Sequence, residues 1–254
     1  MKFHNFSFVF LALLATSAHA FDFGNLEKKL NSLETAPATS PAAANPSALA
    51  NVSNADQVGG LKQALTQGAE TAVANLSKEN GFLGNDKVRI PLPGSLQKAG
   101  DLMHTLGMGK YSDDLVTSMN RAAEAAVPEA KTLLVAAVKN MSVSDAKGIL
   151  MGGNDAATQY FRKNTETAIS AKFKPIVASS MQKVKLAEKY DQFAGKGAQM
   201  GLVDQKDANL DDYITRRAMD GLFLMMAEQE KAIRANPMQA VGSLAQKVFS
   251  AVKY

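Results

Sequence analysis

Apolar side chains recur every three to four positions through most of the chain. From Asp56 onward, the first such stripe consists of Val58, Leu61, Leu65, Ala69 and Leu76. This spacing follows the 3.6-residue period of an α-helix and not the alternation of a strand. No two segments are joined by the turn residues of a β-hairpin. The sequence therefore predicts an all-α fold, a compact multi-helix domain of about eight to ten helices over residues 56–254.

Capping residues and prolines predict where the helices begin. Ser142 and Asn209 are each followed three positions later by an aspartate, which is typical of an N-terminal cap. Further starts are expected at Ser95, Ser112, Pro128, Asp155, Pro175 and Pro237. The helix from Asp155 is expected to end near Phe173, and the last helix to span Met238 to Val252.

For two of these helices the sequence also predicts which residues face the core or occupy the first turn. In the helix after Ser95, the apolar period places Leu102 or Met103, and also Leu106, toward the core. In the helix after Ser112, Asp113 and Asp114 would occupy the first turn, where the helix dipole favours negative charge.

Pro91 and Pro93 interrupt the helical pattern. Each proline fixes its own φ and keeps the residue before it out of the helical region. The segment from Val88 to Pro93 is therefore predicted to be an extended strap that lies across the helical body.

The N-terminus has the pattern of an export signal. Residues 1–20 contain Lys2, an apolar run, and a small-x-small site that ends at Ala20. This predicts a signal peptide cleaved after Ala20 and a periplasmic protein. Residues 21–34 are expected to form a short amphipathic helix, and residues 35–55, rich in Ala, Pro and Ser, a flexible linker. No later run reaches the roughly 18 apolar residues of a membrane span, so no transmembrane segment is expected in the mature chain.

Composition excludes several kinds of chemistry. The chain has no cysteine, which excludes disulfides and thiolate catalysis. Without the signal peptide the only histidine is His104, so a multi-histidine metal site cannot be built. The 28 basic and 24 acidic residues are interspersed, which argues against a nucleic-acid groove. Neither a cofactor nor a metal is predicted.

Several phrases of the sequence resemble a known family. They are "RIPLP" at 89–93, "SMNRAAEAAVPEAK" at 118–131, "GGNDAATQYFR" at 152–162, "FKPIV" at 173–177 and "LDDYITRRAMDGLF" from 210. In this order they are similar to the secreted bacterial family catalogued as domain of unknown function 4197. The resemblance covers roughly residue 60 to the C-terminus. It implies an all-helical exported domain and brings no reaction, cofactor or catalytic residue.

The glycines before Asp155 allow two interpretations. Free N–H groups at a helix start attract anions, and Arg162 would add a cation. However, the phosphate-loop pattern is absent, and the carboxylate of Asp155 would itself accept those N–H bonds. We expect Glu166 to pair with Arg162. A helix stop followed by a cap is the favoured interpretation, with an anion site as the alternative.

Three further polar residues lie among small apolar ones. Asn120 shares a face with apolar neighbours, while Arg121 and Glu124 are one turn apart among alanines. Buried polar groups require hydrogen-bond partners. The favoured interpretation is an Arg121–Glu124 pair that joins two helices, and the alternative is a polar ligand pocket between helices.

Asp220 is the only charge in a stretch that is apolar around its circumference, residues 218–227. Such a residue is predicted to be central, and a buried carboxylate needs a counter-charge. Arg216, Arg217 or Arg121 could supply it. A structural ion pair is favoured over a ligand-binding or catalytic acid.

Function is left as three hypotheses. The first is a non-enzymatic periplasmic protein that binds a small molecule or envelope protein near Asn120, Arg121, Glu124 and Asp220, or near Asp155 and Arg162. The second is a carboxylate-dependent hydrolase that uses some of these groups, although no catalytic residue is assigned. The third is a purely structural domain.

Overall fold

A computed structural model of the protein describes residues 52–182 and 209–252, together with residues 49, 187, 190, 191 and 199. All of these residues belong to one compact unit, Pro41–Tyr254. The predicted signal peptide, the predicted helix of residues 21–34 and most of the predicted linker lie outside the described residues.

The described residues are helical, with irregular connections and no strand. The α-helices are α3 (Asn54–Leu76), α4 (Gly94–Thr105), α5 (Gly109–Ala126), α6 (Ala130–Lys139), α7 (Val143–Met151), α8 (Ala156–Met181), α10 (Leu210–Ala235) and α11 (Ser243–Ala251). Two 3-10 turns, η1 (Val127–Glu129) and η3 (Pro237–Gln239), precede α6 and α11. The predicted all-α class is confirmed. The predicted number of helices applies to a range that extends beyond the described residues.

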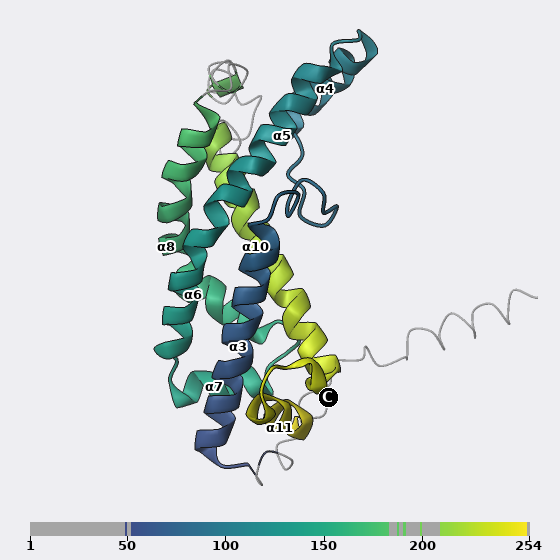
Figure 1. Ribbon diagram of the computed structural model, residues 1–254. Helices are drawn as coiled ribbons and strands as arrows, with labels where there is room; N and C mark the ends of the chain where they lie inside the picture. The colour runs from purple at the N-terminus through teal and green to yellow at the C-terminus, as the bar shows by residue number, and fades with distance from the viewer. Residues whose placement is uncertain are drawn as a thin grey trace, which may run out of the picture. The chain divides into compact units, whose positions relative to one another are not determined.

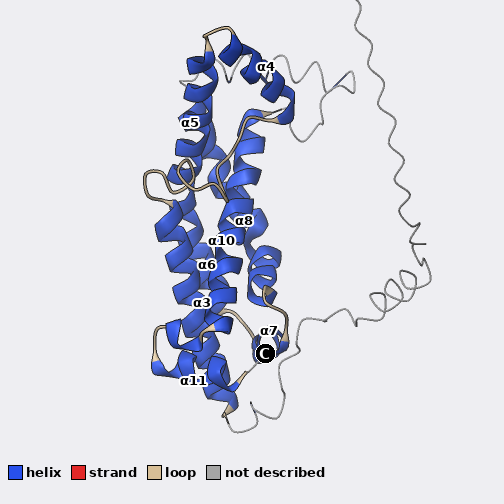
Figure 2. Cartoon of the chain, turned by 90° about the vertical axis from the view of Figure 1, so that its right-hand side faces the viewer, coloured by secondary structure: helices blue, strands red, loops and turns tan. Residues whose placement is uncertain are grey.

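The core lies between α3, α5, α6, α8 and α10. Helix α10 packs against α8, α3 and α5, while α6 contacts α3 and α8. Figures 1 and 2 show α4 at one end of this bundle and α7 with α11 at the other. The stripe predicted on α3 faces the core, because Leu61, Leu65, Ala69 and Leu76 are buried there.

Several predicted helix starts are confirmed by their hydrogen bonds. Ser142 and Asp145 form a reciprocal capping box before α7. The side chain of Asn209 accepts the N–H of Asp212 at a distance of 2.9 Å at the start of α10. Local side-chain chemistry therefore fixes these boundaries.

Other boundaries differ from the prediction. Helix α8 continues through Pro175 to Met181, because Ile169, Phe173, Val177 and Met181 keep one buried stripe on both sides of the proline. Packing of that stripe outweighs the hydrogen bond that proline removes. The last helix begins at Ser243 and not at Met238, since Gly242 has a positive φ of 99° that breaks the helix.

The α4–α5 hairpin also departs from the prediction. Helix α4 begins at Gly94 after Pro93, and α5 begins at Gly109, so Asp113 and Asp114 fall after the first turn. Leu106, predicted to face the core, is exposed. Of the alternatives Leu102 and Met103, Leu102 is exposed and Met103 is partly buried. Leu96, on the same predicted stripe, packs against the core, whereas no described element covers Leu102 and Leu106.

The proline strap between α3 and α4 is non-helical, as predicted. Ile90 is fully buried and Leu92 is partly buried. The hydroxyl of Tyr213 on α10 donates to the carbonyl of Pro91 at 3.1 Å. The strap therefore lies against α5 and α10.

Candidate functional site

Asn120 binds the backbone of the strap. Its Oδ1 accepts the N–H of Ile90 at 2.8 Å, and its Nδ2 donates to the carbonyl of Ile90 at 2.9 Å. Nδ2 also donates to the carbonyl of Val116 at 2.7 Å. One side-chain amide thus satisfies both backbone polar groups of the buried residue Ile90, as the backbone of a neighbouring strand would do.

Glu124 and Arg121 hold the loop that follows α3. The buried carboxylate of Glu124 accepts the N–H groups of Phe82 and Leu83, at 3.0 and 3.2 Å. Arg121 donates to Glu124 at 2.6 Å and to Asn80 at 3.0 Å. The predicted Arg121–Glu124 pair is present, but it joins α5 to a loop and not two helices to each other.

Asp220 is not central. Its side chain is 45% exposed, and its partner is Arg162 on α8 at 3.1 Å, not one of the three arginines considered from the sequence. Arg162 also donates to Glu166 at 3.0 Å and lies 4.6 Å from the ring centroid of Phe223. The outer face of this part of α10, which includes the exposed Leu224, is open to solvent. Apolar neighbours in sequence therefore did not indicate burial.

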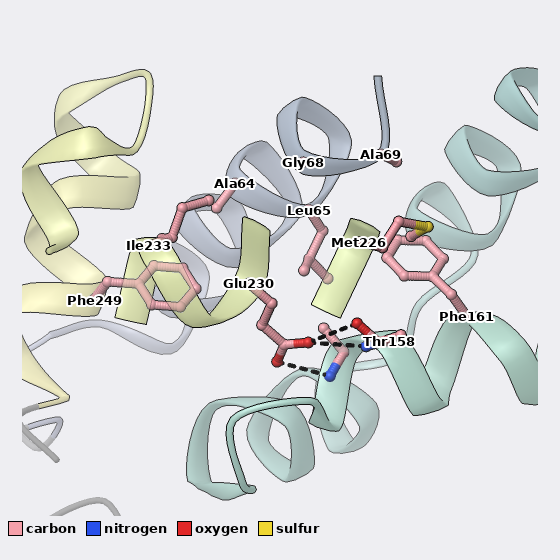
Figure 3. A pocket seen from close by; sticks show the side chains of 11 residues that line it. Ala64, Leu65, Gly68, Ala69, Thr158, Phe161, Met226, Glu230, Ile233 and Phe249 are labelled. Carbon is pink, nitrogen blue, oxygen red and sulfur yellow. Dashed lines mark hydrogen bonds between the residues drawn. The ribbon is translucent and has the colours of Figure 1, made fainter. Parts of the chain in front are cut away.

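Asp155 does not cap α8 with its side chain. The first N–H groups of α8 instead bind the carboxylate of Glu230 from α10 (Figure 3). Ala157 and Thr158 each donate a backbone N–H to Glu230 at 3.0 Å, and the Thr158 hydroxyl donates to it at 3.0 Å. The helix start is thus an anion site, and the protein's own carboxylate occupies it.

Glu230 has a buried counter-charge. Arg234, one turn later on α10, donates to Glu230 at 2.8 Å and to the carbonyl of Ile149 at the end of α7 at 2.9 Å. The side chains of Glu230 and Arg234 are only 5% and 1% exposed. Both residues were missed at the sequence level. The signal was present, because Glu230 continues the buried stripe of Met226 and Ile233.

A small cavity lies beside Glu230. It has a volume of about 20 Å³ and is lined by residues of α3, α8, α10 and α11, among them Leu65, Phe161 and Phe249 (Figure 3). This volume suits about one water molecule and not a larger ligand.

The structure divides the predicted site residues into separate clusters. Asn120, Arg121 and Glu124 act together on one side of α5. Arg162 and Asp220 form a second cluster between α8 and α10. Asp155 belongs to neither, because its carboxylate accepts a hydrogen bond from Gln159.

A family model described as "Protein of unknown function (DUF4197)" matches residues 51–250. The chain belongs to this family. No curated protein and no solved structure matches the chain.

In this DUF4197 chain, a second, larger pocket lies between the strap, α4 and the start of α5. Its volume is about 310 Å³, and its walls include Arg89, Leu92, Asp101, His104 and Val116. The size lies at the lower end of the range for small-molecule sites. None of these pocket residues was predicted as a site residue.

The pocket contains a histidine, a serine and an aspartate in contact. His104 Nε2 lies 3.2 Å from both Ser112 Oγ and Asp113 Oδ1. A catalytic triad uses the two ring nitrogens separately, one for the serine and one for the aspartate. Here both partners meet the same nitrogen, and the serine hydroxyl donates to the carbonyl of Gly109 at 2.7 Å. This arrangement fastens α4 to α5 and lacks the proton relay of a triad.

At the start of α10, two carboxyl groups have perturbed pKa values. Burial raises the pKa of Asp191, although the N–H of Leu210, 2.8 Å from Asp191 Oδ1, acts in the opposite direction. Burial and the neighbouring charges of Asp191 and Asp212 raise the pKa of Asp211.

Within the described residues, no three histidine, aspartate or glutamate side chains are grouped to hold a metal ion. None of the described helices is long and apolar enough to cross a membrane.

Proposed function

We propose that this DUF4197 protein is an exported periplasmic protein that binds a ligand or an envelope partner without catalysing a reaction. Export is supported by Lys2, the apolar run after it and the cleavage pattern that ends at Ala20.

The observation that carries the binding proposal is the exposed apolar end of the α4–α5 hairpin. Leu102, Leu106, Met108 and Tyr111 are 59%, 60%, 46% and 65% exposed, and they fall within ten consecutive residues. Together they form what we call the hairpin patch. Several large exposed apolar side chains within one short segment are typical of a binding site, because leaving them in water is unfavourable.

The state of the acidic residues favours binding over the alternative of a carboxylate-dependent hydrolase. Such a hydrolase needs two available carboxyl groups across a cleft. Glu124 and Glu230 are instead buried and hydrogen-bonded, and Asp220 is paired with Arg162. A purely structural domain would have no need for the hairpin patch.

The proposal can be tested by native mass spectrometry of the protein purified from its own periplasm. We expect a retained small molecule or partner, which the double variant Leu102→Ser/Leu106→Ser loses while its melting temperature stays close to that of the wild type. Leu224→Ser is the matched control, because Leu224 is an exposed leucine of α10 and not of the hairpin. A wild-type protein that retains nothing, or a retained mass that survives the double variant, would contradict the proposal.

The predicted location has its own test. The same mass spectrum should show a chain that begins at Phe21, recovered from the periplasmic fraction. A chain that keeps residues 1–20, or one recovered from the cytoplasm, would show that export is wrong.

A further inference from the structure

The pocket between the strap, α4 and α5 is lined by two solvent-exposed charges of opposite sign. Arg89 comes from the strap and Asp101 from α4. Neither side chain forms a salt bridge, with the other or with any residue in the described part of the chain. The other two polar side chains of the pocket wall, His104 and Asp113, already contact each other at 3.2 Å.

These charges restrict what the pocket can bind. A simple anion would approach Arg89 but would be repelled by Asp101 and Asp113, and a simple cation would be repelled by Arg89. A molecule that carries both charges can satisfy Arg89 and Asp101 at once, through charge-assisted hydrogen bonds. Arg89 and Asp101 form no ion pair with each other, so each is left to contact a different group of such a molecule.

The rest of the pocket offers an apolar surface. Pro91, Leu92 and Val116 form part of its lining, and Leu92 and Val116 are only partly exposed. Gly100 brings α4 close to the strap, since a Cβ at this position would lie 2.8 Å from Leu92 Cδ1. Aliphatic side chains in a small concave site favour a ligand with a short hydrocarbon part.

The pocket wall is held in place before any ligand binds. His104 contacts Ser112 and Asp113, and its ring lies directly against Gly109, where no side chain could fit. Asn120 fixes the strap from the other side through Ile90. A site held in this way loses less conformational entropy on binding.

We propose that this pocket binds a small aliphatic zwitterion of the amino-acid class, either a free amino acid or a short peptide. Its carboxylate binds the guanidinium of Arg89, its ammonium binds the carboxylate of Asp101, and its hydrocarbon part packs on Leu92 and Val116. This inference rests on the proposed binding function and names one class of ligand for it.

Isothermal titration calorimetry of the mature protein tests this assignment with four probes. They are L-leucine, leucyl-leucine, N-acetyl-leucine, which lacks the ammonium, and leucinamide, which lacks the carboxylate. We expect L-leucine or leucyl-leucine to bind at least about tenfold more tightly than the two blocked forms, since each of these loses one charged contact. No binding of either zwitterion, or equal binding of L-leucine and its blocked forms, would overturn the proposal.

Variants assign each charge to its residue. Arg89→Gln should remove the preference for leucine over leucinamide, and Asp101→Asn the preference over N-acetyl-leucine. Lys110→Gln and Asp114→Asn are the matched controls, because both residues are exposed on α5 outside the pocket and should leave all affinities unchanged. If the controls change the affinities as much as the pocket variants do, the assignment is wrong.

The two proposals can fail separately. A protein that binds no zwitterion but retains a mass dependent on Leu102 and Leu106 contradicts only the pocket assignment. A protein that binds no zwitterion and retains nothing contradicts the proposed function as well.

Discussion

Two carboxylates of α10 bind α8, and they differ chiefly in their contact with solvent. Glu230 is 5% exposed, accepts three hydrogen bonds from α8 and pairs with the buried Arg234. Asp220 is 45% exposed and pairs with Arg162, which is itself 39% exposed. The cost of losing a partner rises steeply with burial, so the two links should contribute very differently to stability.

Glu230→Gln should have the largest effect, because it leaves the buried Arg234 without a counter-charge. We expect a loss of about 3–5 kcal/mol in the free energy of unfolding, measured by denaturant titration. Glu228→Gln is the matched control, since it removes an exposed ion pair with Lys87 and should cost less than about 1 kcal/mol. Equal losses in the two variants would show that burial does not separate them.

Asn120→Ala removes a buried side-chain amide, which is polar but uncharged. The substitution leaves the N–H and the carbonyl of Ile90 without their partner. An unsatisfied buried group costs about 1–3 kcal/mol, so we expect a loss of at least this size in the same titration. Asn164→Ala, whose exposed side chain donates only to the carbonyl of Tyr160, should change stability little. A similar loss from both asparagines would contradict the assigned role of Asn120.

Asp220→Asn removes the charge of the solvent-exposed link between α10 and α8. Because solvent screens the Arg162–Asp220 pair and Glu166 remains available to Arg162, we expect a loss below about 1 kcal/mol. A loss of about 3 kcal/mol or more in thermal or denaturant unfolding would place Asp220 with the buried links.

Asp211 differs from both carboxylates, because it is partly buried and its charged neighbours, Asp191 and Asp212, are also acidic. An unfolded aspartate titrates near 3.8, and the folded-state pKa of Asp211 is raised above this value. The folded protein therefore binds the proton more tightly, and the resulting stabilisation is complete below pH 3.8 and lost as the pH rises through the folded-state pKa.

We accordingly expect Asp211→Asn to raise the free energy of unfolding at pH 7, by less than about 1 kcal/mol because solvent screens the group. The gain should shrink toward zero as the pH falls toward 3.8. Asp212→Asn is the control and should have the opposite sign at pH 7, since Asp212 pairs with Lys174 at 2.8 Å. A destabilised Asp211→Asn variant at neutral pH would contradict the raised pKa.

Features that depend on neighbouring residues in sequence could be predicted. The buried stripe of α3, the capping box of Ser142 and Asp145, and the strap around Pro91 all follow from local periodicity, hydrogen bonding or ring geometry. The Arg121–Glu124 and Arg162–Glu166 pairs follow from helical spacing.

Features that depend on distant segments could not. The helical period identifies an apolar face but not whether another element covers it, so it does not reveal that Leu102 and Leu106 are exposed while Met103 is partly buried. Pro175 was read as a helix start because its local cost is known, while the packing that outweighs it involves other helices. The apolar neighbours of Asp220 in sequence predict burial that the structure does not show, whereas Glu230 lies on the buried stripe, where its burial is predictable.

The start of α8 is an anion site that Glu230 occupies. Amide hydrogen exchange of Ala157 and Thr158, followed by nuclear magnetic resonance, measures whether that site is filled. We expect both amides to be protected in the wild type and to exchange at rates that added phosphate does not change. Rapid exchange of these two amides, or protection that appears only when phosphate is added, would contradict the claim.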